Sequence, residues 1–209
     1  GTVLGLASLI VTLGLSRTAG SQIIDQFDEL RASQVMVTPR SSGRDDTPAY
    51  RPWNVETRLD RLNGVVASGA VADVPNPGQI RTVALVDPSG EFEHTVPVLA
   101  ASAGVLDAVR GHIAAGRWFD QGHIDRADQV AVIGVKLAQE LGIRRLDVQP
   151  GIYIGEHFFS VIGIVDEAIR DRGFLGSVVI TSTAADAVFD VRRPQRVVIE
   201  VEIGAGDVI

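Results

Sequence analysis

The hydrophobic pattern sets an apolar N-terminal run apart from the rest of the chain. Residues 1–15, GTVLGLASLIVTLGL, carry no charged side chain. A membrane span needs about 20 apolar residues, so this run predicts the end of a transmembrane helix that would start before Gly1. A signal-peptide core and a buried helix are the alternatives. Beyond Arg17 the apolar residues recur on one helical face, at Ile23, Ile24, Phe27 and Leu30. We expect residues 1–33 to be the end of a transmembrane helix that continues as an amphipathic exit helix, although a helix packed on its own domain would show the same face.

After residue 33 the pattern changes to short apolar runs separated by turn residues. Strands are predicted at 34–38, 65–74, 80–86, 92–99, 129–133, 151–155, 158–165, 178–181 and 196–203. Short helices are predicted at 54–62, 103–109, 135–141 and 183–189. The strands and helices intermix without regular βαβ spacing. This favours an α+β fold in which a middle segment is inserted into a first lobe.

The stretch 114–134, AAGRWFDQGHIDRADQVAVIG, holds the most conspicuous cluster of chemical groups. It contains an aromatic pair, Trp118 and Phe119, and then a run of acids around one histidine: Asp120, His123, Asp125 and Asp128. One imidazole with two carboxylates could bind a metal ion, but no second histidine stands at a ligand spacing on a helix. Our prediction is that Asp120 caps a short helical turn and the other acids are solvated.

No pattern for nucleophilic or phosphate chemistry is present. Ser68 lies closest to a GxSxG motif, but it falls inside a predicted strand and not at a strand-to-helix turn. The chain has no HExxH and no glycine-rich loop that ends in lysine. The four histidines, His94, His112, His123 and His157, lie in different predicted elements, and the carboxylate pairs Asp166/Glu167 and Asp186/Asp190 resemble solvated faces. We expect no catalytic residues, no cofactor-binding residues and no metal ligands, so the protein is predicted not to be an enzyme.

Composition narrows the possible partners. The 209 residues are 45% hydrophobic and carry a net charge of −7, which argues against a nucleic-acid partner because phosphate binding needs a basic face. The absence of cysteine excludes disulfides, thiolate metal sites and a cysteine nucleophile. A peptide, a lipid or a small molecule stays possible as a partner.

The order of the motifs resembles the permeases of MacB/FtsX-type ABC transporters. An apolar helix is followed by GLSRTAGSQIIDQFDEL and QVMVTP, which is similar to the first transmembrane helix of that family and its exit. The middle of the chain, AGRWF, QVAVIGVKLAQELGI and PGIYIGEHFFSVIGIV, is similar to the extracytoplasmic core domain, and VVITSTAADAVF with RVVIEVEI fits the return towards the membrane. The resemblance implies a discontinuous porter-like first lobe at 34–101 and 177–209, with an inserted second lobe at 102–176. It also implies that Trp118 and Phe119 dock on a core.

The resemblance implies a function in transport. The chain would be the extracytoplasmic domain of a permease that contacts substrate or a partner protein and transmits ATP-driven movement, either between lobes or between paired copies. Its implied partners are a cytoplasmic ABC ATPase, a second permease copy or a related permease, an extracytoplasmic protein and the membrane, with residues 34–209 outside the cytoplasm. An FtsX-like activator of a cell-wall hydrolase is the alternative, and a secreted enzyme behind a signal peptide is the alternative from another class.

Overall fold

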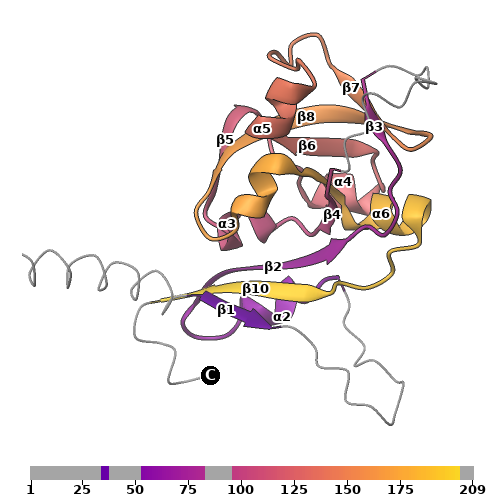
Figure 1. Ribbon diagram of the computed structural model, residues 1–209. Coiled ribbons are helices and arrows are strands. Elements are labelled where there is room, and N and C mark those ends of the chain that lie inside the picture. Colours follow the sequence, from indigo (N-terminus) through magenta and orange to yellow (C-terminus); the bar gives the residue numbers. More distant parts are fainter. Residues whose placement is uncertain (1–33, 38–52, 83–95, 203–209) are drawn as a thin grey trace, which may run out of the picture.

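The computed structural model describes residues 34–37, 53–82 and 96–202, and these form one mixed sheet covered by short helices (Figure 1). The sheet has ten strands in the described residues, in the order β1-β10-β2-β4-β9-β6-β8-β7-β3, and β5 pairs separately with β8. The strands are β1 (Gln34–Val37), β2 (Val65–Asp73), β3 (Ile80–Arg81), β4 (Val98–Ala101), β5 (Gly111–Gly116), β6 (Val130–Gly134), β7 (Gly151–Ile154), β8 (His157–Ala168), β9 (Val178–Thr181) and β10 (Arg196–Val201). The helices are α2 (Glu56–Leu59), α3 (Val105–Ala108), α4 (Gln121–Asp125), α5 (Val135–Glu140), the 3₁₀ helix η1 (Arg172–Gly176) and α6 (Ser182–Phe189).

The predicted α+β class is confirmed, and most predicted strands and helices lie within a few residues of their expected bounds. Strand β5 was not predicted, because its sequence GHIAAG holds one β-branched residue among two glycines, two alanines and a histidine. The predicted helix at 1–33 lies outside the described residues, as does most of the predicted strand at 80–86. Among the residues that the structure describes, no helix is long and apolar enough to cross a membrane.

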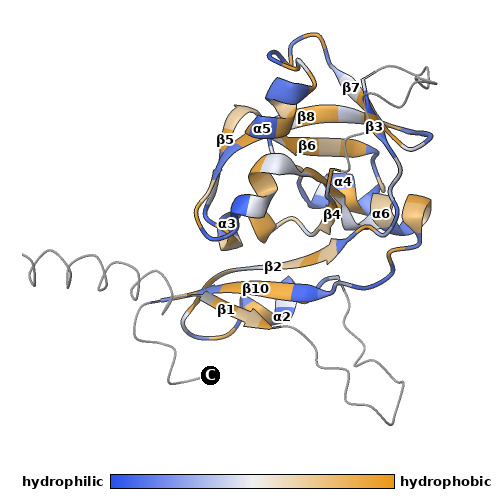
Figure 2. Cartoon of the chain, viewed as in Figure 1, coloured by the Kyte–Doolittle hydropathy of each residue, from blue (hydrophilic) through white to orange (hydrophobic). Residues whose placement is uncertain are grey.

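Three strands and one helix form a layer that we call the base sheet: β1, β10, β2 and α2. Strand β10 lies between β1 and β2, and both pairings are antiparallel. Because side chains alternate along a strand, one face of β10 presents Val197, Ile199 and Val201, which pack with Val55, Leu59 and Val65 beside α2. Figure 2 shows that β10 is mostly hydrophobic apart from its ends. The base sheet therefore has a small apolar core of its own on the α2 side.

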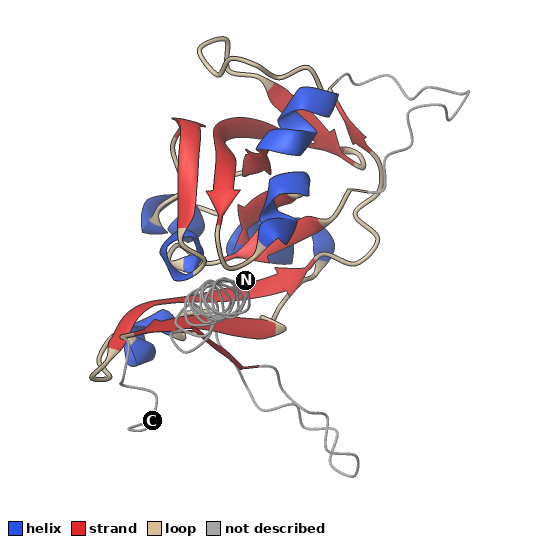
Figure 3. Cartoon of the chain, turned by 60° about the vertical axis from the view of Figure 1, so that its left-hand side comes forward, coloured by secondary structure: helices blue, strands red, loops and turns tan. Residues whose placement is uncertain are grey.

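The remaining described residues, 74–82 and 96–195, form a larger unit that we call the body. In its central strands, alternate residues point to opposite faces. Residues such as Val178 and Ile180 of β9 pack under α5 and α6, whereas Val179 packs with α3, α4 and η1. Figure 3 shows the body's helices on both sides of its strands. The body thus has two apolar layers, one on each face of its sheet.

Strand β2 connects the base sheet to the body. Its residues 65–71 pair with β10, and its residues 71–73 pair with β4. Val71 is opposite both Arg196 of β10 and Ala101 of β4, so the strand changes partner at this position. The predicted lobe boundaries at 102 and 176 stay a prediction. Backbone pairing does not mark them, because β6 inside the predicted second lobe pairs with β9 outside it, for example Ala131 with Ile180.

Candidate functional site: the acidic stretch and the interface between base sheet and body

The acidic stretch begins with a helix cap. Asp120 is the N-cap residue of α4, and its carboxylate accepts a hydrogen bond of 3.1 Å from the backbone N–H of His123. The imidazole Nδ1 of His123 lies 2.7 Å from the same carboxylate oxygen and 3.3 Å from the backbone nitrogen of Asp120. These contacts form a reciprocal capping box. These contacts confirm the prediction that Asp120 caps a helical turn. The same hydrogen bonding to His123 lowers the pKa of Asp120.

The other two acids of the stretch have separate partners. Asp125 accepts a hydrogen bond of 2.7 Å from the Gln121 side chain one turn earlier. Asp128 pairs with the guanidinium of Arg126, whose Nη2 lies 2.6 Å from a carboxylate oxygen. Within residues 34–37, 53–82 and 96–202, no three histidine or acidic side chains gather closely enough to hold a metal ion. The absence of a catalytic metal here stays a prediction that metal analysis can test.

The aromatic pair before the acids packs into the body. The rings of Trp118 and Phe119 stack with centroids 4.3 Å apart, and Phe119 is 1% exposed. The indole N–H of Trp118 donates a hydrogen bond of 2.9 Å to the carbonyl of Ala103, just before α3. The expectation that this pair docks on a core therefore agrees with the structure. The two aromatic residues thus hold the connection between β5 and α4 against α3 and the core of the body.

Two glycines allow the backbone to approach closely on either side of this stretch. Gly116 has φ +74°, and a Cβ there would lie 2.1 Å from the carbonyl oxygen of Ile162. Gly134 ends β6 with φ −71° and is needed for space alone, because a Cβ there would lie 2.2 Å from the backbone of Leu175. Both contacts are with backbone atoms of neighbouring segments, so neither can be relieved by a side-chain rotation.

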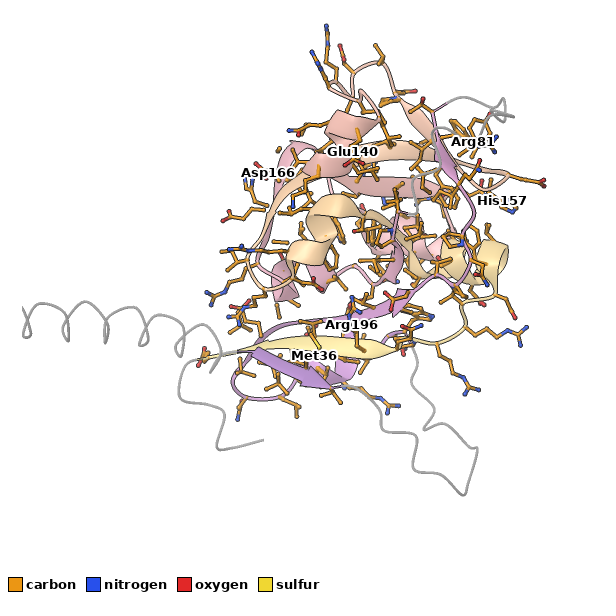
Figure 4. The ribbon with its side chains drawn as sticks, in the orientation of Figure 1. Met36, Arg81, Glu140, His157, Asp166 and Arg196 are labelled. Carbon is orange, nitrogen blue, oxygen red and sulfur yellow. The ribbon has the colours of Figure 1, made fainter. Side chains whose placement is uncertain are left out.

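The remaining candidate groups lie apart from one another. His112 pairs with Asp166 at 2.7 Å on the exposed edge formed by β5 and β8, whereas His157 makes an edge-on contact with the ring of Phe189. Figure 4 shows Asp166 and His157 on opposite sides of the body. Ser68 is buried and donates to the carboxylate of Asp60. His94 lies outside the described residues. The described residues do not bring these groups together into a nucleophile–base pair.

The most unusual electrostatics lie where β10 meets the body. Glu200 is 7% exposed, and its carboxylate oxygen lies 2.5 Å from Nε of Arg110 and 3.7 Å from Nη2 of Arg170. The side chain of Arg170 is 2% exposed. Burial lowers the pKa of Arg170, as does the neighbouring Arg110 to a smaller extent. The backbones of Arg110 and Arg170 lie side by side beyond the β5–β8 pair, where the N–H of Arg170 bonds to the carbonyl of Val109 and the N–H of Ile169 to the carbonyl of Arg110. One carboxylate of the base sheet is thus shared by two arginines of the body.

A second charged contact lies on the same face of β10. Arg196 is 3.6 Å from a carboxylate oxygen of Asp171, the N-cap residue of η1, and 3.7 Å from Asp73 at the end of β2. Asp171 directly follows Arg170 in the sequence, and Arg196 and Glu200 are two strand repeats apart, so their side chains share one face. Figure 4 labels Arg196 on β10, facing the body, with Met36 beside it on β1.

A third polar contact joins α2 to the body. The carboxylate of Glu56 accepts hydrogen bonds from the hydroxyl of Ser102 and from the backbone N–H of Gly104, at 3.2 Å in the second case. The Ser102 oxygen in turn accepts from the N–H of Ala70 on β2. Burial raises the pKa of Glu56, and the hydrogen bond from Ser102 partly opposes this shift. Glu56 therefore connects the base sheet to the start of α3.

Sequence reasoning did not find these interface residues. Glu200, Arg170 and Arg110 are far apart in the sequence. Ion pairs between residues of different strands leave no characteristic spacing in the sequence. One signal was present: the closing run RVVIEV places Arg196 and Glu200 on one face of an otherwise apolar strand. A charge on the buried face of a strand needs a partner, so this pattern could have predicted a complementary pair in the body.

Comparison with known proteins agrees with this architecture. The model of the MacB-like periplasmic core domain matches residues 1–207. The chain belongs to that family. Its fold is similar to the periplasmic region of MacB from Actinobacillus actinomycetemcomitans, with a TM-score of 0.58 and 9% identity over 84% of this chain and 78% of that one. It is also similar to the extracellular domain of the noncanonic ABC-type transporter YknZ from Gram-positive bacteria, with a TM-score of 0.55 and 17% identity over 74% of this chain and 82% of that one. No curated protein matches the chain significantly.

Family membership confirms the resemblance seen in the sequence. MacB-like periplasmic core domains are extracytoplasmic parts of ABC-transporter permeases, and the two similar structures are a periplasmic and an extracellular domain. The family's domains belong to transporters rather than enzymes. The paired charges make the interface between the base sheet and the body the candidate functional site of this domain.

Proposed function

We propose that this chain is the extracytoplasmic domain of a permease that contacts a substrate or partner protein and transmits conformational change driven by a cytoplasmic ABC ATPase. Family membership supports the setting. The observation that carries the mechanical part is the pairing of the two outer strands of the base sheet. Gln34, the first described residue, is paired with Glu200, near the last. The described chain enters and leaves the base sheet at the same place.

This geometry suits a domain that is held at one end. If the permease has a membrane helix before β1 and another after β10, both would pull on adjacent strands of one sheet. The body lies on the other side of β2 from these strands, and its exposed apolar side chains include Val148 at 74% exposure and Phe158 at 46%. We propose that the body makes the contacts with substrate or partner. A permease pair, of identical or related copies, would supply two such domains.

The proposed role requires no chemistry within the domain. The acidic stretch is a capped helix with individually paired acids, and its aromatic pair is part of the core. No specific observation favours the activator of a cell-wall hydrolase over the exporter, since both would use the same mechanical connection. A secreted enzyme receives no support from the arrangement of the described histidines, serines and acids.

Labelling in intact cells tests the location on which the proposal depends. The chain has no cysteine, so Val148→Cys in the full permease introduces one defined thiol into this domain. A maleimide that cannot cross membranes should label this thiol in intact cells. Val179→Cys, at a position that is 1% exposed, is the matched control and should stay unlabelled until the protein is denatured. If Val148→Cys reacted only after the membrane is made permeable, the domain would be cytoplasmic and the proposal wrong.

A further inference from the structure

The interface between the base sheet and the body is built as a charge-matched contact around an apolar centre. On the face of β10 towards the body, the residues are Arg196, Val198 and Glu200 in order. The body places Asp171 against Arg196, and it places Arg170 and Arg110 against Glu200. The positive end of this β10 face thus meets an acidic residue of the body, and the negative end meets two arginines. We call these five charged residues the β10 clamp.

The clamp specifies one relative position of the two units. A displacement of β10 along its own axis would separate Glu200 from its arginines and bring Arg196 towards Arg170. Buried charges are costly unless they are paired, and Arg170 and Glu200 are 2% and 7% exposed. The clamp therefore opposes sliding of the base sheet more strongly than an apolar contact would, because apolar packing has little directional preference.

The apolar centre opposes separation as well. Val71 of β2 and Val198 of β10 belong to the same buried cluster as Val105 and Ala108 of α3, and none of these four is more than 1% exposed. Helix α3 lies directly on β2, where a Cβ on Gly69 would be 2.5 Å from the Cα of Val105. A hinge that opened between the units would expose this cluster to water.

Two further connections fix the same interface from other directions. Strand β2 pairs with both β10 and β4, so the sheet is continuous from the base sheet into the body. Glu56 of α2 bonds to Ser102 and Gly104, which lie between β4 and α3. Packed side chains, ion pairs and rigid secondary elements are the physical connections through which distant sites are coupled. Here a strand ladder, a core, a carboxylate contact and the clamp all restrain one interface.

We infer that the base sheet and the body move as one rigid unit, held in register by the β10 clamp, so that ATP-driven movement occurs between copies of the domain and not by a hinge within it. This inference rests on the proposed function, and it chooses between two ways in which the movement could be expressed. Every displacement of β1 and β10 would then move the body by the same rigid-body motion, and none would be absorbed at the interface.

Distance measurements within one copy test the inference directly. In the full permease with its ATPase, Val66→Cys on β2 and Val148→Cys in the body place spin labels on exposed positions of the two units, at 58% and 74% exposure. Labelled copies are diluted with copies that lack these cysteines, so that one domain carries both labels. We expect the same distance distribution without nucleotide and with trapped ATP. A shifted mean or a second distance with ATP would overturn the inference.

Clamp variants show whether the β10 clamp provides the rigidity. Glu200→Gln removes the negative charge that Arg110 and Arg170 share, and we expect a broader Val66–Val148 distribution even without nucleotide. Arg192→Gln is the matched control, because the Arg192–Asp190 pair is 2.6 Å long but 74% exposed on both sides. That control should leave the distribution unchanged. Equal, narrow distributions in the clamp variant and the control would show that the clamp has no such role.

A milder variant covers the case in which Glu200→Gln fails to fold. Asp171→Asn removes one clamp charge but keeps an oxygen that can accept the hydrogen bond from the N–H of Gly173. It should broaden the distribution less than Glu200→Gln and more than Arg192→Gln, and no broadening would contradict the inference. Failure of the proposed function is recognised separately, because cytoplasmic labelling of Val148→Cys would refute the function without changing any distance within the domain.

Discussion

Replacing Phe119 by alanine tests whether the turn before the acidic stretch is a core element. Its ring is 1% exposed, stacks on Trp118 at 4.3 Å and belongs to the apolar layer shared by α3, α4 and η1. Burial of about 150 Å² of aromatic surface at about 25 cal/mol per Å² contributes roughly 4 kcal/mol. Truncation also leaves a cavity and removes the ring stack, and measured Phe→Ala substitutions in cores cost about 3–5 kcal/mol. We expect Phe119→Ala to lower the free energy of unfolding by an amount in that range.

Urea unfolding followed by circular dichroism measures this change. A domain of ordinary stability has about 5–15 kcal/mol in total, so the midpoint should fall strongly, with an unchanged slope if the folded state is otherwise intact. Phe158→Ala is the matched control, because Phe158 is 46% exposed on β8, and it should lose about 1 kcal/mol or less. Equal midpoints for Phe119→Ala and the wild type would refute the reasoning that the turn is docked on the core.

Four further predictions concern the glycine contacts, the helix cap, the buried carboxylate and metal binding. Gly134→Ala should unfold the body at a lower temperature, because its Cβ would lie 2.2 Å from backbone, whereas Gly176→Ala has open space and should not. The pKa of Asp120 is lowered in the folded protein. Its carboxylate should therefore stabilise the fold above about pH 4, and this stabilisation should be lost as the pH falls through the pKa of the folded state. Carboxyl NMR, and the pH dependence of the melting temperature compared with Asp120→Asn, check this. Burial raises the pKa of Glu56 in the folded protein, so protonation of this side chain favours the folded state. The wild type should therefore gain stability relative to Glu56→Gln as the pH falls from 7 towards 4. If the stabilities of the two proteins changed with pH in parallel, this prediction would be wrong. Metal analysis of the purified protein should find no stoichiometric transition metal, and a tightly bound metal that is lost in His123→Ala would overturn this expectation.

The elements that could be predicted from the sequence are those with strong local signals. The run QVAVIG is apolar and bounded by polar residues, and it forms β6 within one residue of expectation. The position of Asp120 before a short polar helix predicted the helix cap. The predicted strands at 151–155 and 158–165 correspond to β7 and β8, and Gly155 has φ +60° in the turn between them. In each case residues close in sequence determine the local conformation, so the sequence pattern was sufficient.

The interface residues could not be predicted in the same way. The partners of Glu200 are Arg110 and Arg170, which lie at the ends of β5 and β8, and β5 itself has a weak strand signal. Partner choice depends on which strands become neighbours, and β2 changes partner within its own length. The bulge at Val66, where β10 residues Glu200 and Val201 oppose Ala67 and Val65, is also invisible in the hydrophobic pattern.

The proposed function requires that this domain, which lies outside the cytoplasm, changes position in response to the ATPase cycle in the cytoplasm. The most direct measurement is the distance between Val148→Cys labels on two copies in the assembled permease with its ATPase, without nucleotide and with trapped ATP. The account predicts that the distance distribution shifts when ATP is trapped and returns after hydrolysis, while an ATPase variant that cannot bind ATP shows no shift. An identical distribution in all nucleotide states, in a complex that hydrolyses ATP normally, would contradict the account.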